Sequence, residues 1–279
     1  MLLTDAVRVG QSVVSVGDRG VILLGGADGR SWRAARSPGG PLLTAVRFLD
    51  DRRGWAVGHD SVIVATADGG ENWSQQFSAP KEQRPLLDVL FLDATRGFAV
   101  GAYGAYYETA DGGATWKPRA VLQEDRHLNA IVSVGGSRLL AFGEAGTILR
   151  SDDAGGSWAL VASPYQGSLF GAVVVSDAVV IAYGLRGRIL RSTDAGKTWA
   201  MVDNASTATL MGGALLPDGA VALAGAAGTV LMSRDAGRSF FPVASGTSRA
   251  LSKALPSPGG LLLFGEAGVR SVALPAAPR

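Results

Sequence analysis

The sequence predicts an all-β protein, a single seven-bladed β-propeller, from three observations: a recurring turn, strand-like runs between the turns, and no long stretch of helical periodicity. The turn is Gly-x-x-Gly or close to it, and it begins at seven positions: Gly17, Gly58, Gly101, Gly143, Gly184, Gly225 and Gly265. The successive spacings of 41, 43, 42, 41, 41 and 40 residues fit one blade per repeat.

Each repeat contains short apolar or alternating runs separated by turn residues, for example AVRF, GWAVG, SVIVATA and NWSQQF in the second one. Four such runs predict four strands per blade. The repeats lie within one domain, residues 1–279, at approximately 5–36, 43–78, 86–120, 128–162, 169–203, 210–244 and 251–274. The apolar stretch 169–185 is shorter than the roughly 20 residues that cross a bilayer, so we interpret it as a β-hairpin.

Composition excludes several classes of chemistry. The chain has 39 Gly but no Cys, which excludes disulfides, thiolate metal sites and a cysteine nucleophile. Its 26 Lys and Arg against 24 Asp and Glu give a net charge of only +2, which does not favour nucleic acid as a partner. Two His and no Cys argue against a metal site, and the sequence contains neither HExxH nor a Walker loop, so we expect no cofactor.

A second motif, D-x-G-x-[ST]-W or a close variant, follows the turns of the second to sixth repeats. The motif residues are Asp68 with Trp73, Asp111 with Trp116, Asp153 with Trp158, Asp194 with Trp199, and Asp235 with Phe240. A turn aspartate accepts backbone hydrogen bonds, glycine supplies a positive φ, and the aromatic side chain packs between blades. These residue types indicate a structural role, and the chain resembles the Asp-box propellers, also called bacterial neuraminidase repeat proteins. The first repeat is degenerate, with Ala27 at the Asp position.

The seventh repeat ends at GVRSVALPAAPR after its third strand, so the last blade lacks its outermost strand in this chain. Propellers of this kind usually take that strand from the other end of the chain, yet only residues 1–5, expected to be a leading loop, precede the first strand at 6–9. Two hypotheses stay open. Either the native product begins upstream of Met1 with a closing strand and a signal peptide, or Met1 is the start and the blade has three strands.

The face that carries the Gly-x-x-Gly turns and the loops between blades is the candidate docking surface. Arg, Tyr, Phe and His are enriched where proteins grip a peptide, and repeats two to five supply most of those on this face. The candidate partner-binding residues are His59, Arg84, Tyr103, Arg126, His127, Tyr165 and Arg186. Phe170 is ambiguous between this face and the core.

An enzyme is the main alternative. Sialidases share the Asp box, but the arginine-isoleucine-proline motif of their first blade is absent here. Another glycosidase would need two carboxylates across a cleft, for which Glu124, Asp125, Glu144 and Glu266 are the acidic candidates. A carbohydrate-binding propeller is the other alternative. We predict no catalytic residues.

At the level of whole repeats, the chain looks like the photosystem II stability and assembly factor family and its bacterial relatives. The segments FLDDRRGWAVG and FLDATRGFAVG carry the likeness, which extends over about residues 6–274. The resemblance implies a non-enzymatic scaffold that binds an exposed segment of a membrane protein through an arginine-rich face. It also implies a periplasmic location, whereas a true start at Met1 without a signal peptide implies the cytoplasm. We expect a monomer that does not itself span the membrane.

Overall fold

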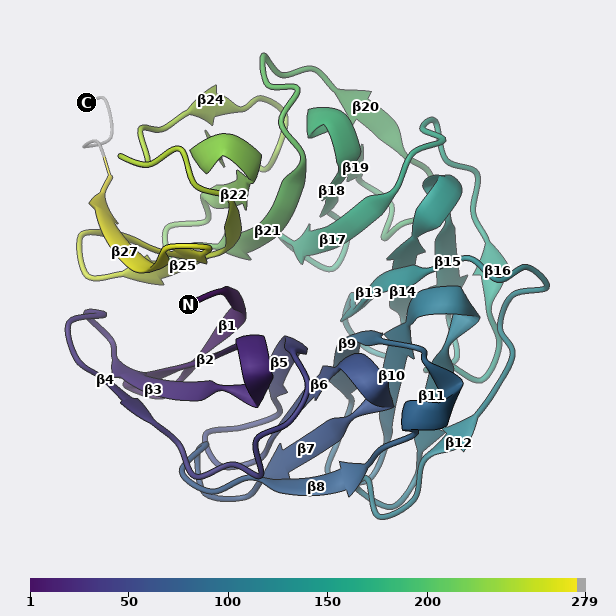
Figure 1. The fold of residues 1–279 in the computed structure, drawn as a ribbon. Coiled ribbons are helices and arrows are strands. Elements are labelled where there is room, and N and C mark those ends of the chain that lie inside the picture. The colour runs from purple at the N-terminus through teal and green to yellow at the C-terminus, as the bar shows by residue number, and fades with distance from the viewer. Residues whose placement is uncertain (275–279) are drawn as a thin grey trace.

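The computed structural model describes residues 1–274 and arranges them as seven antiparallel sheets around a central channel, as Figure 1 shows. Six sheets have four strands and the seventh has three, so the predicted seven-bladed propeller with an incomplete last blade is confirmed. The hairpin predicted at 169–185 is also confirmed, as β17 and β18. The described residues contain no helix that could cross a membrane.

In each blade the strands follow one another in chain order from the channel to the outer rim. Blade 1 holds β1 (Leu3–Val9), β2 (Ser12–Gly17), β3 (Ile22–Gly26) and β4 (Trp32–Ala34); blade 2 holds β5 (Leu43–Phe48), β6 (Gly54–Gly58), β7 (Ile63–Thr66) and β8 (Ser74–Phe77); blade 3 holds β9 (Leu86–Phe91), β10 (Gly97–Gly101), β11 (Tyr106–Thr109) and β12 (Lys117–Pro118); blade 4 holds β13 (Leu128–Ser133), β14 (Leu139–Gly143), β15 (Ile148–Ser151) and β16 (Ala159–Leu160). Blade 5 holds β17 (Leu169–Val174), β18 (Val180–Gly184), β19 (Ile189–Ser192) and β20 (Ala200–Val202); blade 6 holds β21 (Leu210–Leu215), β22 (Val221–Gly225), β23 (Val230–Ser233) and β24 (Phe241–Pro242); blade 7 holds β25 (Leu251–Ser257), β26 (Gly260–Gly265) and β27 (Gly268–Ala273).

The second strand of each blade is the most deeply buried. All five residues of β6 and of β10 are buried, because the neighbouring blades cover both faces of the sheet. A strand buried on both faces reads as a continuous apolar run rather than an alternating one. This explains runs such as GWAVG.

The first glycine of each turn is required by a close approach of backbone. At Gly58 a Cβ atom would lie 2.1 Å from the carbonyl oxygen of Leu42, on the chain entering the innermost strand. The register of that strand shifts between Leu43 and Ala45, which is a β-bulge. The same shift occurs at this end of all seven innermost strands.

One boundary prediction was wrong. Residues 3–5, expected to be part of a leading loop, belong to β1, because Leu3 pairs with Gly17 and the bulge at Thr4 carries the pairing on to Asp5. The bulge interrupts the alternation of apolar and polar residues that marks a strand in the sequence. The first residues of β1 therefore did not look like a strand.

Candidate functional site

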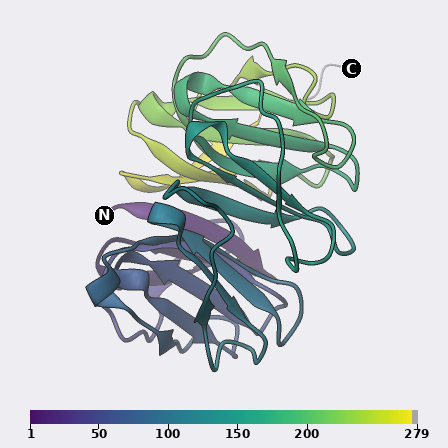
Figure 2. The ribbon, with the colours of Figure 1, turned by 90° about the vertical axis from the view of Figure 1, so that its right-hand side faces the viewer.

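Six of the seven Gly-x-x-Gly turns form tight turns on one face of the ring, each with two consecutive residues of positive φ. They are η1 (Asp18–Gly20), η2 (His59–Ser61), η4 (Ala102–Gly104), η5 (Glu144–Gly146), η6 (Leu185–Gly187) and η7 (Ala226–Gly228). Figure 2 shows them on the same side of the ring as the N-terminus. We call this side the turn face.

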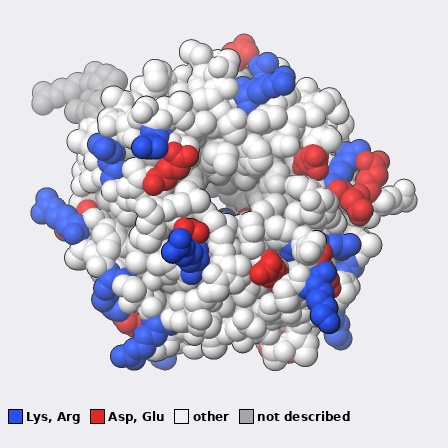
Figure 3. All heavy atoms as spheres, viewed as in Figure 1, with Lys and Arg blue, Asp and Glu red and all other residues white. Residues whose placement is uncertain are grey.

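The middle residue of each turn adopts a left-handed conformation, with φ between 52° and 57°. These residues are Arg19, Asp60, Tyr103, Ala145, Arg186 and Ala227, and all are exposed. Each of the first six blades therefore presents one side chain to solvent at a fixed position, and its chemistry changes from blade to blade. Figure 3, which views the turn face, shows basic and acidic side chains interspersed around its rim.

Four of the predicted partner-binding residues gather at blade 3. The ring of Tyr103 meets the imidazole of His127 edge-on, with centroids 4.9 Å apart, and 51% of Tyr103 is exposed. The N–H of Gly104 donates to the carbonyl oxygen of Arg126 at 2.9 Å, which ties the next loop to η4. We call Arg84, Tyr103, Arg126 and His127 the blade-3 corner.

Arg84 borders a surface groove of about 230 Å³ that Tyr103, Tyr107, Leu122 and Glu124 also line. The Ser61 hydroxyl donates to the carbonyl oxygen of Arg84 at 2.7 Å, so the backbone there is held against η2. Within residues 1–274 the exposed guanidinium of Arg84 makes no hydrogen bond or ion pair. Arg84 is therefore available to an incoming group.

Arg126 differs from Arg84, although the sequence suggested the same role for both. Its guanidinium forms an ion pair with Glu124 at 2.6 Å and reaches the Thr147 hydroxyl at 3.4 Å. A partner's carboxylate would have to compete with Glu124 for it. Among the described residues, Arg126 is thus paired, whereas the guanidinium of Arg84 makes no hydrogen bond or ion pair.

The remaining predicted residues lie elsewhere on the turn face. Tyr165 is half-buried and its hydroxyl donates to the carbonyl oxygen of Leu185 at 3.1 Å, which places it against η6 beside the exposed Arg186. His59 is exposed in η2, where the backbone carbonyl oxygen of Asp60 accepts a hydrogen bond from the N–H of Ala79 at 3.0 Å. Tyr165 and Arg186 thus form a second group on blade 5.

The carboxylates of the Asp boxes accept hydrogen bonds within their own turns. In the third blade, Oδ1 of Asp111 accepts the backbone N–H of Thr115 and the hydroxyl of Thr109, each at 2.8 Å, and Oδ2 accepts the Thr115 hydroxyl at 2.6 Å. These bonds, with those from Thr115 the strongest, lower the pKa of Asp111 to about 2. The same pattern recurs at Asp68, Asp153, Asp194 and Asp235. In residues 1–274 no three His, Asp or Glu side chains are grouped so as to bind a metal ion.

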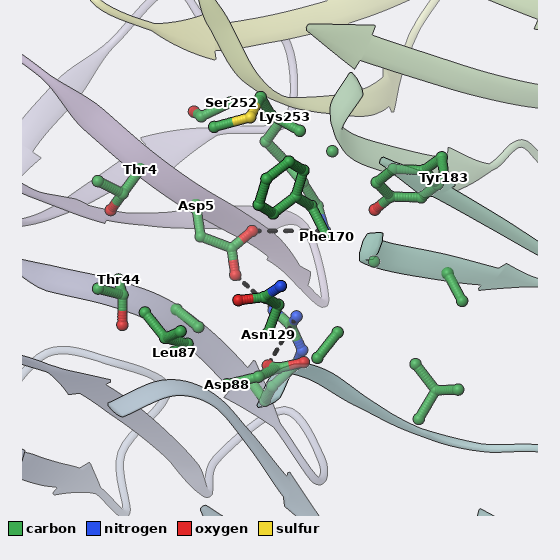
Figure 4. Close-up of a pocket in the computed structure, with 18 residues that line it drawn as sticks. Thr4, Asp5, Thr44, Leu87, Asp88, Asn129, Phe170, Tyr183, Ser252 and Lys253 are labelled. Atoms are coloured by element: carbon green, nitrogen blue, oxygen red, sulfur yellow. Dashed lines mark hydrogen bonds and ion pairs between the residues drawn. The ribbon is translucent and has the colours of Figure 1, made fainter. Parts of the chain in front are cut away.

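The channel contains charged residues that the sequence interpretation missed. A cavity of about 100 Å³ is lined by Asp5, Arg47, Asp88 and Lys253, and Figure 4 shows Tyr183 across it from Asp5. Phe170, which the sequence left ambiguous, lines this cavity and is half-buried. The signal was present: the position of Asp5, Asp88 and Lys253 is Ala or Gly in the other four repeats.

The two buried aspartates in the channel are paired with half-buried cations. Burial favours the neutral form of Asp5, yet the Lys253 ammonium and the Arg47 guanidinium hold the pKa of Asp5 below its ordinary value. Burial is the largest influence on Asp88 and raises its pKa in spite of the contact with Arg47. Both carboxylates are thus engaged in ion pairs with Arg47 or Lys253.

The fold and the turn face define the class of this protein, an Asp-box β-propeller that presents a rigid ring of exposed turns. Residues 76–215, half of the chain, match the family of the photosynthesis system II assembly factor YCF48. The chain belongs to this family.

Solved structures agree on the fold. The chain is 21% identical to the structure "YCF48 bound to D1 peptide", with a TM-score of 0.74 over 96% of this chain and 91% of that one. It is 20% identical to YCF48 from Cyanidioschyzon merolae, with a TM-score of 0.72 over 96% of this chain and 94% of that one. The WD40 propeller of Doa1, at 15% identity, superposes with a TM-score of 0.76 over 97% of this chain and 92% of that one. No curated protein sequence gives a match.

Proposed function

We propose that this protein is a non-enzymatic assembly factor that binds an exposed segment of a membrane protein complex on its turn face, at the blade-3 corner. Family membership supports a protein partner. The structure of YCF48 with a D1 peptide supports a peptide-like segment as the part that is bound. By the same resemblance, we propose that binding takes place outside the cytoplasm.

One observation carries the choice of the blade-3 corner. Arg84 places an unbonded guanidinium beside the half-exposed ring of Tyr103, over a groove. Arg and Tyr are the residue types that most often contribute large shares of binding energy at protein interfaces. A guanidinium also binds a carboxylate in a bidentate manner, so an acidic or C-terminal group fits this corner best.

Three of the four candidate acids of the hydrolase alternative make contacts within the turn face, and the fourth, Asp125, is exposed and lines the groove beside Glu124. Glu124 is paired with Arg126 at 2.6 Å. Glu144 accepts the backbone N–H of His127 at 3.3 Å, and Glu266 accepts that of Ala250 at 3.4 Å. Each of these carboxylates stabilises a loop of the turn face.

Affinity capture from membranes of the source cell, followed by mass spectrometry, tests the proposal. The Arg84→Ala and Arg126→Ala double variant should lose the captured complex while its thermal unfolding stays unchanged. Truncating such a contact costs about 1–4 kcal/mol, so binding should weaken at least about fivefold. Because Arg126 already has a partner, the single Arg84→Ala variant should account for most of the loss.

The matched control removes two cations from the opposite face. Lys197 and Arg238 are exposed residues of Asp-box turns, so the Lys197→Ala and Arg238→Ala double variant changes the net charge equally. It should retain the captured complex. Undiminished capture by the Arg84/Arg126 variant would exclude the blade-3 corner. Capture of no specific complex by the parent protein would favour a carbohydrate ligand, and glycan screening would follow.

A further inference from the structure

The joint between blades 7 and 1 is the place where the two ends of the described residues, 1–274, meet. In Figure 1, β1 lies beside blade 7, at the start and the end of the described chain. No strand of residues 1–274 pairs with the outer edge of β27, so no strand is shared between these two blades in the described part of the chain. In the described part of the chain, the contacts between blades 7 and 1 are therefore made by side chains and by the packing of the two sheets.

The first contact is a hydroxyl hydrogen bond at the bulge of the innermost strand. The Ser252 hydroxyl, in β25, donates to the carbonyl oxygen of Leu3, in β1, at 2.7 Å. The bulge residue makes the same bond to the next blade at three other joints, through Thr4, Thr44 and Asn129, at 2.6, 2.6 and 2.9 Å. At the other three joints the position holds Leu87, Phe170 or Met211, whose side chains cannot form it.

The second contact is a chain of partly buried charges from blades 7, 1, 2 and 3, and Figure 4 labels Asp5, Asp88 and Lys253 among them. The Lys253 ammonium, from blade 7, lies 3.4 Å from Oδ1 of Asp5 in blade 1. Oδ2 of Asp5 accepts the N–H of Val46 at 3.1 Å and the guanidinium of Arg47, both in blade 2. Arg47 continues to Asp88 in blade 3 at 2.9 Å, and Asp88 accepts a backbone N–H from β13 of blade 4 at 3.1 Å.

A third set of contacts between blades 7 and 1 is made by Arg8, Trp32 and Gly29. The guanidinium of Arg8 donates through Nε to the carbonyl oxygen of Pro256 at 3.0 Å. The ring of Trp32 meets Phe264 edge-on, with centroids 5.9 Å apart, and a Cβ at Gly29 would lie 2.4 Å from a methyl group of Leu262. The degenerate first box has thus lost its aspartate but kept the glycine and the aromatic residue that pack on the preceding blade.

We infer that Ser252, Lys253 and Asp5 form a clasp that holds blade 7 against blade 1 and so helps to keep the propeller ring closed. The polar contacts are concentrated on blades 7, 1, 2 and 3, the non-covalent joint and its neighbours. Blades 5 and 6 carry Gly171 and Gly212 where the clasp has Asp5 and Lys253. The clasp lies at the turn-face end of the channel, so its opening would also separate the turns of blades 7 and 1.

Amide hydrogen exchange tests the clasp in the intact protein. In the Ser252→Ala and Lys253→Met double variant, amides of β1 and of β25–β27 should exchange about tenfold faster or more, while those of β13–β15 change little. The matched control is Thr44→Val, which removes the equivalent hydrogen bond at the covalently connected joint of blades 2 and 3. It should show no selective increase at β1 and β25–β27. Lys253→Arg keeps a cationic donor and should stay close to the parent protein.

A circular permutant separates ring opening from general destabilisation. Joining the two ends of the chain through a flexible linker, with new ends in the loop between β12 and β13, makes the joint of blades 7 and 1 covalent. The selective exchange caused by the double variant should then largely disappear. Uniform exchange in the double variant, or selective exchange that persists unchanged in the permutant, would overturn the clasp. If the double variant fails to fold, the Ser252→Ala single variant and its permutant provide the same comparison.

Discussion

Gly196, in the Asp box of blade 5, is a position where adding one methyl group should lower the free energy of unfolding in an informative way. Its φ is +84°, and a Cβ there would lie 2.6 Å from both Cδ atoms of Leu140, on the second strand of blade 4. Gly219 offers a matched control because its φ is +83° and a Cβ would meet nothing within 4 Å. Gly196→Ala therefore combines backbone strain with a packing clash, and Gly219→Ala tests the strain alone.

The magnitudes follow from these two effects. A left-handed conformation costs an alanine about 1–2 kcal/mol, partly offset by the lower entropy of the unfolded chain. Overpacking a filled site adds about 1–3 kcal/mol. We expect a loss of about 1 kcal/mol for Gly219→Ala and of about 2–4 kcal/mol for Gly196→Ala. With an unfolding entropy near 0.6 kcal/mol/K for a domain of this size, the Tm should fall by about 2 °C and about 3–7 °C.

Urea denaturation and differential scanning calorimetry of the two variants provide the measurement. The difference between the variants isolates the contact between the Asp-box turn and the preceding blade. Equal losses of stability, or a larger loss for Gly219→Ala, would refute the claim that the box glycine is required by packing between blades.

The other predictions concern acid stability and a buried hydroxyl. The Asp111 carboxyl has a folded-state pKa of about 2, below the value of an unfolded aspartate, so its contribution is complete above about pH 4 and is lost as the pH falls towards 2. Unfolding free energies measured across that range should fall less steeply for Asp111→Asn, and an unchanged slope would contradict the role of the carboxylate. Tyr106 accepts the indole N–H of Trp158 at 3.2 Å, and burial raises the pKa of Tyr106 to about 12. Tyr106→Phe should lose about 1 kcal/mol in urea denaturation; no loss would mean that the indole finds another acceptor.

Much of the fold could be predicted from the sequence because each blade repeats the same turns and the same local hydrogen bonds. The close approach at Gly58 and the hydrogen bonds at Asp111 involve residues near in sequence, so their requirements recur with the repeat. The missing strand of blade 7 was also visible as a missing box. The exception was residues 3–5, where the bulge at Thr4 disrupted the alternation that marks a strand.

The candidate site was only partly predictable. The sequence placed Arg84 and Arg126 on loops of one face, but which of the two is free depends on a contact with Glu124. The sequence also grouped Tyr165 with the exposed residues, whereas its hydroxyl is bonded to η6. The partner of a charged loop residue depends on the conformation of the loop backbone. The residue types alone do not specify that conformation.

The sequence by itself determined the number of blades, their strands and the turns that carry exposed side chains, since these depend on local sterics and hydrogen bonds repeated seven times. Only the tertiary structure decided how the ring closes. Asp5 and Lys253 lie at opposite ends of the chain, and their contact exists because seven twisted sheets bring blade 7 back against blade 1. The repeat shows that this position is charged in three blades, but which charges meet is set by the contact between blades 7 and 1.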